Sequence, residues 1–238
     1  MTNFSIENFQ KDLFSNKKYE NELDKERHAR IINTKREIIG VSMANIRKIA
    51  KTISKENCQE FLEFSKTRNF LEEYYEEILI EGLVIANLKD FENMTNNLSW
   101  WLEKIDSWAF VDSVCSTMKN LKNYQDEKYF DYFYNLCYSN QEFISRFGII
   151  SIMCNYLNEK YIDRIIYMCK NVANDAFYVQ MGIAWLVSVC FVKFREKTFE
   201  LIKSKTLPKF VQNKSISKCH DSYRVKREDK ELLKKFRK

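Results

Sequence analysis

Glycine and proline are nearly absent from this chain, and their scarcity limits the folds open to it. Only 4 glycines and 1 proline occur among 238 residues. Tight hairpins, glycine-rich phosphate loops and many-stranded sheets need such residues at their turns. Abundant Lys, Glu and Leu favour helix instead. The sequence therefore predicts an all-α protein.

Apolar residues recur at helical spacing along most of the chain, and short polar connectors separate the helical runs. The predicted helices come in pairs about every 35 to 40 residues, the period of HEAT-type arrays, although no residue motif repeats. We therefore expect an α-solenoid of HEAT-like helical hairpins with a concave binding face, and a compact irregular bundle is the alternative. The helical spans that matter below are predicted at 5–14, 16–34, 42–53, 69–88, 91–105, 108–119, 142–157, 176–193 and 210–223.

We expect a single repeat domain over residues 1–238. In this scheme residues 1–34 form atypical N-terminal helices, and residues 203–238 form a basic C-terminal cap. The cap contains 13 Lys or Arg against 4 Asp or Glu, whereas residues 60–106 contain 4 against 11. A basic end beside an acidic middle is consistent with a polyanionic partner, and equally with a solvated basic tail.

The seven cysteines are scattered, and no pair has the Cys-x-x-Cys spacing of a zinc or redox site. The two histidines have no cysteine pair beside them either. Such a pattern is typical of reduced, buried thiols in a cytoplasmic protein without a metal site. The polar N-terminus does not resemble a signal peptide, and the longest apolar run, Met181 to Val192, is too short to span a membrane.

One short stretch, Trp100 to Asp112, contains three of the four tryptophans. On a helix, Trp108 and Asp112 lie on one face, one turn apart. A carboxylate beside an aromatic face can stabilise a positive charge that develops during a reaction. The alternative is a helical core residue with Asp as a cap. Trp100 and Trp101 are expected to be packing residues.

Two further residues lie in apolar helices. Arg146 is a lone cation in its helix, so it should face a partner or a groove. Gly182 lies three residues before Trp185 and is expected to leave room beside its indole. Taken alone, a structural ion pair and a core tryptophan are the simpler interpretations. Taken together, Trp108, Arg146 and Trp185 lie on the second helices of successive predicted hairpins, which line one face of a solenoid.

At these residues the chain resembles the AlkD-like DNA alkylation repair family of HEAT-like alkylpurine DNA glycosylases. The resemblance covers nearly the whole chain, in family order. The matching pieces are Ile39-Gly40-Val41 with Arg47, Ser107 to Ser113, Arg146 to Ile150, Tyr178 to Trp185, and Ser222-Tyr223-Arg224-Val225.

The resemblance implies hydrolysis of the N-glycosidic bond of N3- or N7-alkylated purines in double-stranded DNA, by a monomer that needs no metal or cofactor. It assigns Trp108 and Trp185 to the deoxyribose of the lesion, Asp112 to the developing sugar cation, and Arg146 to the nearby backbone. Further DNA contacts are expected from Arg47, Lys48, Lys51 and Arg224.

The chain departs from the active branch of the family at two places. Residues 29–33 offer no aromatic side chain where active members carry one, and Leu-Val-Ser-Val follows Trp185 in place of an Arg-Glu pair. The alternative function is therefore a non-catalytic HEAT-like scaffold that binds nucleic acid or a protein partner.

Overall fold

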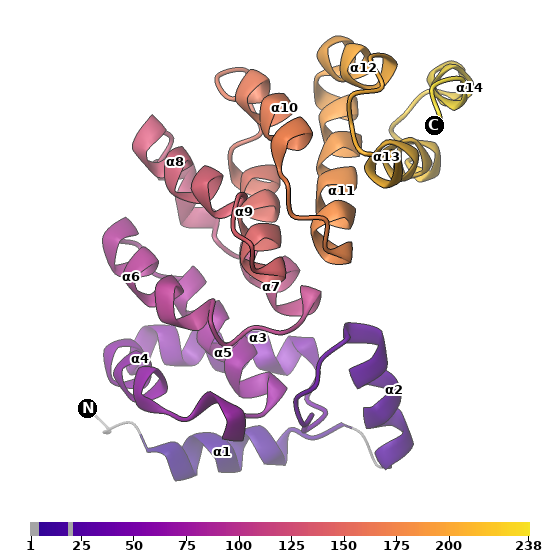
Figure 1. Ribbon diagram of the computed structural model, residues 1–238. Helices are drawn as coiled ribbons and strands as arrows, with labels where there is room; N and C mark the ends of the chain where they lie inside the picture. Colours follow the sequence, from indigo (N-terminus) through magenta and orange to yellow (C-terminus); the bar gives the residue numbers. More distant parts are fainter. Residues whose placement is uncertain (1–4, 19–20) are drawn as a thin grey trace. The chain divides into compact units, whose positions relative to one another are not determined.

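The computed structural model describes residues 5–18 and 21–238, and within these ranges it contains fourteen α-helices and no β-strand (Figure 1). The predicted all-α fold of helical hairpins is confirmed. By their contacts the residues divide into two compact units, Met1–Tyr124 and Gln125–Lys238. The predicted single repeat domain over residues 1–238 stays a prediction.

The first unit is built around α5, which packs against α3, α4, α6 and α7. Every residue of α5 is buried. Its helices are α1 (Ile6–Ser15), α2 (Glu22–Ile32), α3 (Met43–Glu56), α4 (Cys58–Thr67), α5 (Tyr75–Ala86), α6 (Phe91–Trp101) and α7 (Trp108–Cys115), with 3-10 helices at Phe70–Glu72 and Lys119–Asn123.

The second unit is built around α11, which packs against α9, α10, α12 and α13. The helices α9, α11 and α13 run side by side, and each is the second helix of a hairpin (Figure 1). The helices of this unit are α8 (Glu127–Leu136), α9 (Glu142–Asn155), α10 (Ile162–Asn171), α11 (Phe177–Lys193), α12 (Arg195–Lys203), α13 (Lys209–Asp221) and α14 (Arg227–Lys234).

Hydrogen bonds connect equivalent positions of successive hairpins. Tyr124 Oη donates to the carbonyl of Lys89 at 2.7 Å, 35 residues earlier. In the second unit Tyr161 Oη donates to Gln125 O at 2.6 Å, and Lys193 Nζ to Leu157 O at 3.2 Å, each across 36 residues. The repeat that the sequence indicated only through helix spacing is thus accompanied by a repeat of hydrogen bonds from side chains to backbone carbonyls.

Several predicted helices are shorter in the structure, and the one predicted at 91–105 ends at Trp101. The helix predicted at 69–88 begins at Tyr75, because Tyr74 is extended and its N–H donates to Glu77 Oε2 at 3.0 Å. The helix predicted at 16–34 covers only α2, between Asn21 as N-cap and Asn33, whose φ of 55° is left-handed; residues 19 and 20 lie outside the described residues. The helix predicted at 108–119 ends at Cys115.

Trp101 is fully buried, and its Nε1 donates to Ile78 O at 2.8 Å. Its indole also occupies the space that Gly82 leaves on α5, since a Cβ at Gly82 would lie 2.6 Å from Trp101 Cε2. The predicted packing role of Trp101 is confirmed.

Candidate functional site

Helix α7 carries Trp108 and Asp112, and Ser107 defines where it begins. The Ser107 hydroxyl accepts the N–H of Ala109 at 3.1 Å, as an N-cap does. The apolar residues of α7, including Phe110, Val111 and Val114, are buried. Trp108 and Asp112 are half-buried, as expected of one helix face that is not packed into the core. The predicted shared face on one helix is confirmed.

The start of α7 is tied to the end of α2. Ser107 Oγ donates to the carbonyl of Ile32, and Trp108 Nε1 donates to the carbonyl of Ile31 at 3.3 Å. Asp106 adds two bonds, because its carboxylate accepts Thr34 Oγ1 at 2.8 Å and the Lys35 N–H at 3.0 Å. These contacts give the indole of Trp108 a defined position.

Helix α2 buries only Ile32. The side chain of Ile31, the residue whose carbonyl accepts from Trp108, is 61% exposed. His28 faces inward instead, and burial lowers its pKa despite the opposing effect of Glu76, so it is neutral near pH 7. Helix α2 therefore ends with an exposed aliphatic residue next to Trp108.

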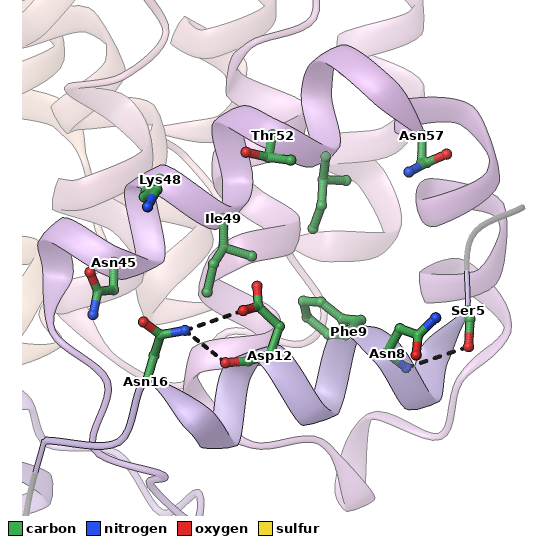
Figure 2. A pocket seen from close by; sticks show the side chains of 11 residues that line it. Ser5, Asn8, Phe9, Asp12, Asn16, Asn45, Lys48, Ile49, Thr52 and Asn57 are labelled. Carbon is green, nitrogen blue, oxygen red and sulfur yellow. Dashed lines mark hydrogen bonds between the residues drawn. The ribbon is translucent and has the colours of Figure 1, made fainter. Parts of the chain in front are cut away.

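The three basic residues of α3 that were expected to contact DNA lie in two different places. Arg47 and Lys51 line a hollow of about 550 Å³ together with Lys119 and Asn120, just beyond α7. Lys48 instead lines a hollow of about 410 Å³ between α1 and α3, whose floor contains Phe9 and Ile49 (Figure 2). The structure thus groups Arg47 and Lys51 with Lys119 and separates them from Lys48.

In the second unit Arg146 lies on α9 and is only 5% exposed. Its Nη1 donates to the carbonyl of Tyr178 at 2.7 Å, and its guanidinium lies 6.0 Å from the Tyr178 ring centroid. Gly182 lies beside it, and a Cβ at that position would make ordinary contact, 3.5 Å from Arg146 Nη1 and 3.6 Å from Ile149. The space at Gly182 was expected beside the indole of Trp185; its nearest neighbours belong to α9 instead.

Trp185 and Arg224 line one hollow, of about 390 Å³, together with Lys218 and Tyr223. Lys218 Nζ lies 5.9 Å from the Trp185 ring centroid. Arg146 does not line this hollow. Trp185 is half-buried.

Sequence reasoning missed Lys119, Lys218 and Tyr223. Lys218 lies four residues, about one helical turn, after Lys214 on α13, so the basic face of that helix was visible in the spacing. Lys119 and Tyr223 lie in connectors, where periodicity carries no information about position.

Across residues 5–18 and 21–238 no group of three or more His, Cys, Asp or Glu side chains is arranged to hold a metal ion. Burial raises the pKa of Cys137, Cys169, Cys190 and Cys219, which keeps these thiols protonated and unreactive. Within the described part of the chain, no helix is both long and apolar enough to cross a membrane.

Comparison with known proteins identifies the family of this chain. No curated protein and no solved structure matches this chain. Residues 14–216 match the family described as DNA alkylation repair enzyme. That match includes α7, α9 and α11, the helices that carry Trp108, Asp112, Arg146 and Trp185. The chain therefore belongs to the DNA alkylation repair enzyme family.

Proposed function

We propose that this protein is a DNA glycosylase that releases N3- or N7-alkylated purines from double-stranded DNA and acts as a monomer. The observation that carries the proposal is the pair on α7, where Asp112 lies one turn after an indole whose position is held by Ile31. A fixed aromatic face and a half-buried carboxylate on a single short helix suit a developing cation better than they suit packing.

The chemistry follows from the substrate. An alkylated purine is already cationic and leaves readily, so cleavage of the bond to C1′ leaves positive charge on the sugar. Asp112 stabilises this oxocarbenium-like charge and orients the attacking water, as a carboxylate does in glycoside hydrolysis. Trp108 contacts the deoxyribose with the negative face of its ring, and Trp185 offers an aromatic face to the DNA from the second unit. No metal or cofactor takes part in this scheme.

The basic residues hold the phosphates. Arg47 and Lys51 act together in their hollow, and Lys119 joins them. Arg224 acts from the connector after α13, and Arg146 contacts the DNA backbone from α9, where its Nη1 also donates to the carbonyl of Tyr178. Lys48 adds charge at a separate place. Each phosphate contact that is lost should weaken binding for all sequences and lower its salt dependence.

The test is release of free base from methylated DNA, with 7-methylguanine and 3-methyladenine separated by chromatography. A known alkylpurine glycosylase serves as positive control. Asp112→Asn keeps the shape of the side chain and removes its charge, so we expect base release to fall roughly 10²-fold. Asp163→Asn is the matched control, because it breaks only an exposed ion pair with Lys197 at 2.8 Å. Wild-type protein that releases no base where the positive control does would refute the proposal.

A non-catalytic DNA-binding scaffold is the second candidate. The observation that favours it is on α2, where the exposed residue beside Trp108 is Ile31 and not an aromatic one. This candidate predicts that the protein binds duplex DNA with salt-sensitive affinity, releases no base, and loses no function in Asp112→Asn.

A further inference from the structure

Two aromatic side chains from different elements meet at one hollow of the second unit. Trp185 and Val189 of α11 form one wall, and Lys218 and Asp221 of α13 form the other. Tyr223 and Arg224, from the connector between α13 and α14, complete it. We call it the Trp185–Tyr223 hollow; its volume of about 390 Å³ is enough for a nucleotide-sized ligand.

Each aromatic ring of the hollow lies beside a cation. Lys218 Nζ lies 5.9 Å from the centroid of the Trp185 ring, and Arg224 Cζ lies 5.6 Å from that of Tyr223. Asp221 is the one acid in the lining, and its carboxylate is 80% exposed and 4.0 Å from His220. Because that charge is well hydrated, the hollow favours an anionic ligand.

Tyr223 is the most exposed of the large hydrophobic side chains on the described residues, at 87%. Its backbone is nevertheless anchored on both sides. Ser222 Oγ accepts the Arg224 N–H at 3.2 Å, and the Val225 side chain, two residues after Tyr223, is buried. The connector thus exposes the aromatic ring of Tyr223 to solvent while its neighbouring residues fix the backbone. The face of the ring is therefore open for a ligand to stack on.

The kind of anion follows from the combination of rings and cations. Phosphates alone would need only the cations. In a paired duplex the bases stack on one another, so an external ring has no base face to contact, whereas an unpaired base does. Aromatic platforms with adjacent positive charge are how proteins hold single strands without reading their sequence.

We propose that the Trp185–Tyr223 hollow binds an unpaired stretch of a DNA strand, with one base stacked on Tyr223 and the adjoining phosphates against Lys218 and Arg224. The inference rests on the proposed function for the choice of DNA as ligand, and it does not depend on base release.

The experiment measures fluorescence anisotropy of the full chain with a labelled oligodeoxythymidylate and with a fully paired duplex, at one fixed salt concentration. Tyr223→Ala should weaken single-strand binding roughly 5- to 100-fold, the range for loss of one stacked base. Tyr223→Phe keeps the ring and should bind within about twofold of wild type. Tyr167→Ala, on α10, is the matched control, because that tyrosine is also exposed, at 58%. It should have no effect.

The duplex and the salt dependence give independent readouts. Duplex binding should change less than about twofold in Tyr223→Ala, because no unpaired base is present. Lys218→Gln should reduce the slope of log K against log salt for the single strand by about 0.7. Unchanged single-strand binding by Tyr223→Ala, or equal weakening by Tyr167→Ala, would overturn the inference.

The two proposals can fail separately. If Asp112→Asn and wild type both release no base, yet both bind single strands in a Tyr223-dependent way, the glycosylase proposal fails and the hollow stands. If wild type releases base and Tyr223→Ala binds single strands normally, the glycosylase stands and the hollow fails.

Discussion

Two glycines in the second unit lie in the middle of α9 and α11, and alanine should have opposite effects at these positions. At Gly148 a Cβ would lie 2.6 Å from Cys137 N, 2.7 Å from Phe133 O and 2.9 Å from Leu136 C. All three atoms are backbone of α8 or of the residue after it, so none can rotate away. At Gly182 the nearest atoms are side-chain atoms at 3.5 and 3.6 Å, which is ordinary contact.

The magnitudes follow from these distances. Alanine gains about 1 kcal/mol over glycine inside a helix. At Gly148 the helices α8 and α9 must separate by several tenths of an ångström, and overpacking of this kind costs about 1–3 kcal/mol or more. With a cost near the upper end of that range, because all three close atoms are backbone, the net loss should be about 2 kcal/mol, which lowers Tm by about 4–8 °C for a chain of this length. Gly182→Ala should instead gain about 0.5–1 kcal/mol, and Tm should rise by about 1–4 °C.

The assay is thermal unfolding followed by far-UV circular dichroism, with urea unfolding as a second measurement. Both variants are compared with wild type at one pH and salt concentration. If Gly148→Ala melts at or above the wild-type temperature, the close approach of α8 and α9 is not the reason for glycine there. If Gly182→Ala destabilises as much as Gly148→Ala, the space assigned beside Arg146 is wrong.

Three other variants test how the first unit is held together. Ser107→Ala should cost about 1 kcal/mol by loss of the cap on α7, and amide exchange should speed up at the start of α7 and the end of α2, because Ser107 also bonds Ile32. Glu76→Gln should destabilise by about 1–3 kcal/mol in urea unfolding, since the buried carboxylate accepts the N–H groups of Ile39 at 2.9 Å and Gly40 at 2.7 Å. Burial, and then repulsion by Glu73, raises the pKa of Glu81 well above its ordinary value. The folded state therefore binds more protons than the unfolded state. The free energy of unfolding should fall as pH rises above about 4.3, the ordinary pKa of Glu, and through the folded pKa. In Glu81→Gln that fall should flatten, and urea midpoints between about pH 5 and 8 that keep the wild-type slope would contradict the assignment.

The helices themselves follow from short-range information. Scarce glycine and proline, apolar spacing and local caps are all visible along the chain, and Ser42 and Ser107 cap α3 and α7 through bonds within three residues. The pair of Trp108 and Asp112 on one helix face was equally predictable, because only the helical period is needed.

Helix ends depended on distant partners. The apolar run at 69–88 continues across the true start of α5. That start is marked by the distant carbonyl of Glu37, which accepts the Tyr75 N–H at 2.9 Å, and by the capping contact of Glu77 with Tyr74. Glu81 on that helix suggests a solvated face, yet it is 1% exposed because Lys104, 23 residues later, reaches it at 3.1 Å. Local pattern cannot report such partners, since they come from another element.

By itself, then, the sequence determined the fold class, the approximate repeat and the residues whose chemistry suits a developing cation, because each depends on spacing along one helix. Tertiary structure alone decided which cations share a hollow, that Gly182 lies beside Arg146, and that the exposed Tyr223 lines the Trp185–Tyr223 hollow. Those outcomes depend on how neighbouring helices pack. Packing brings together residues that are far apart in the sequence, and the helical period along one segment does not predict such contacts.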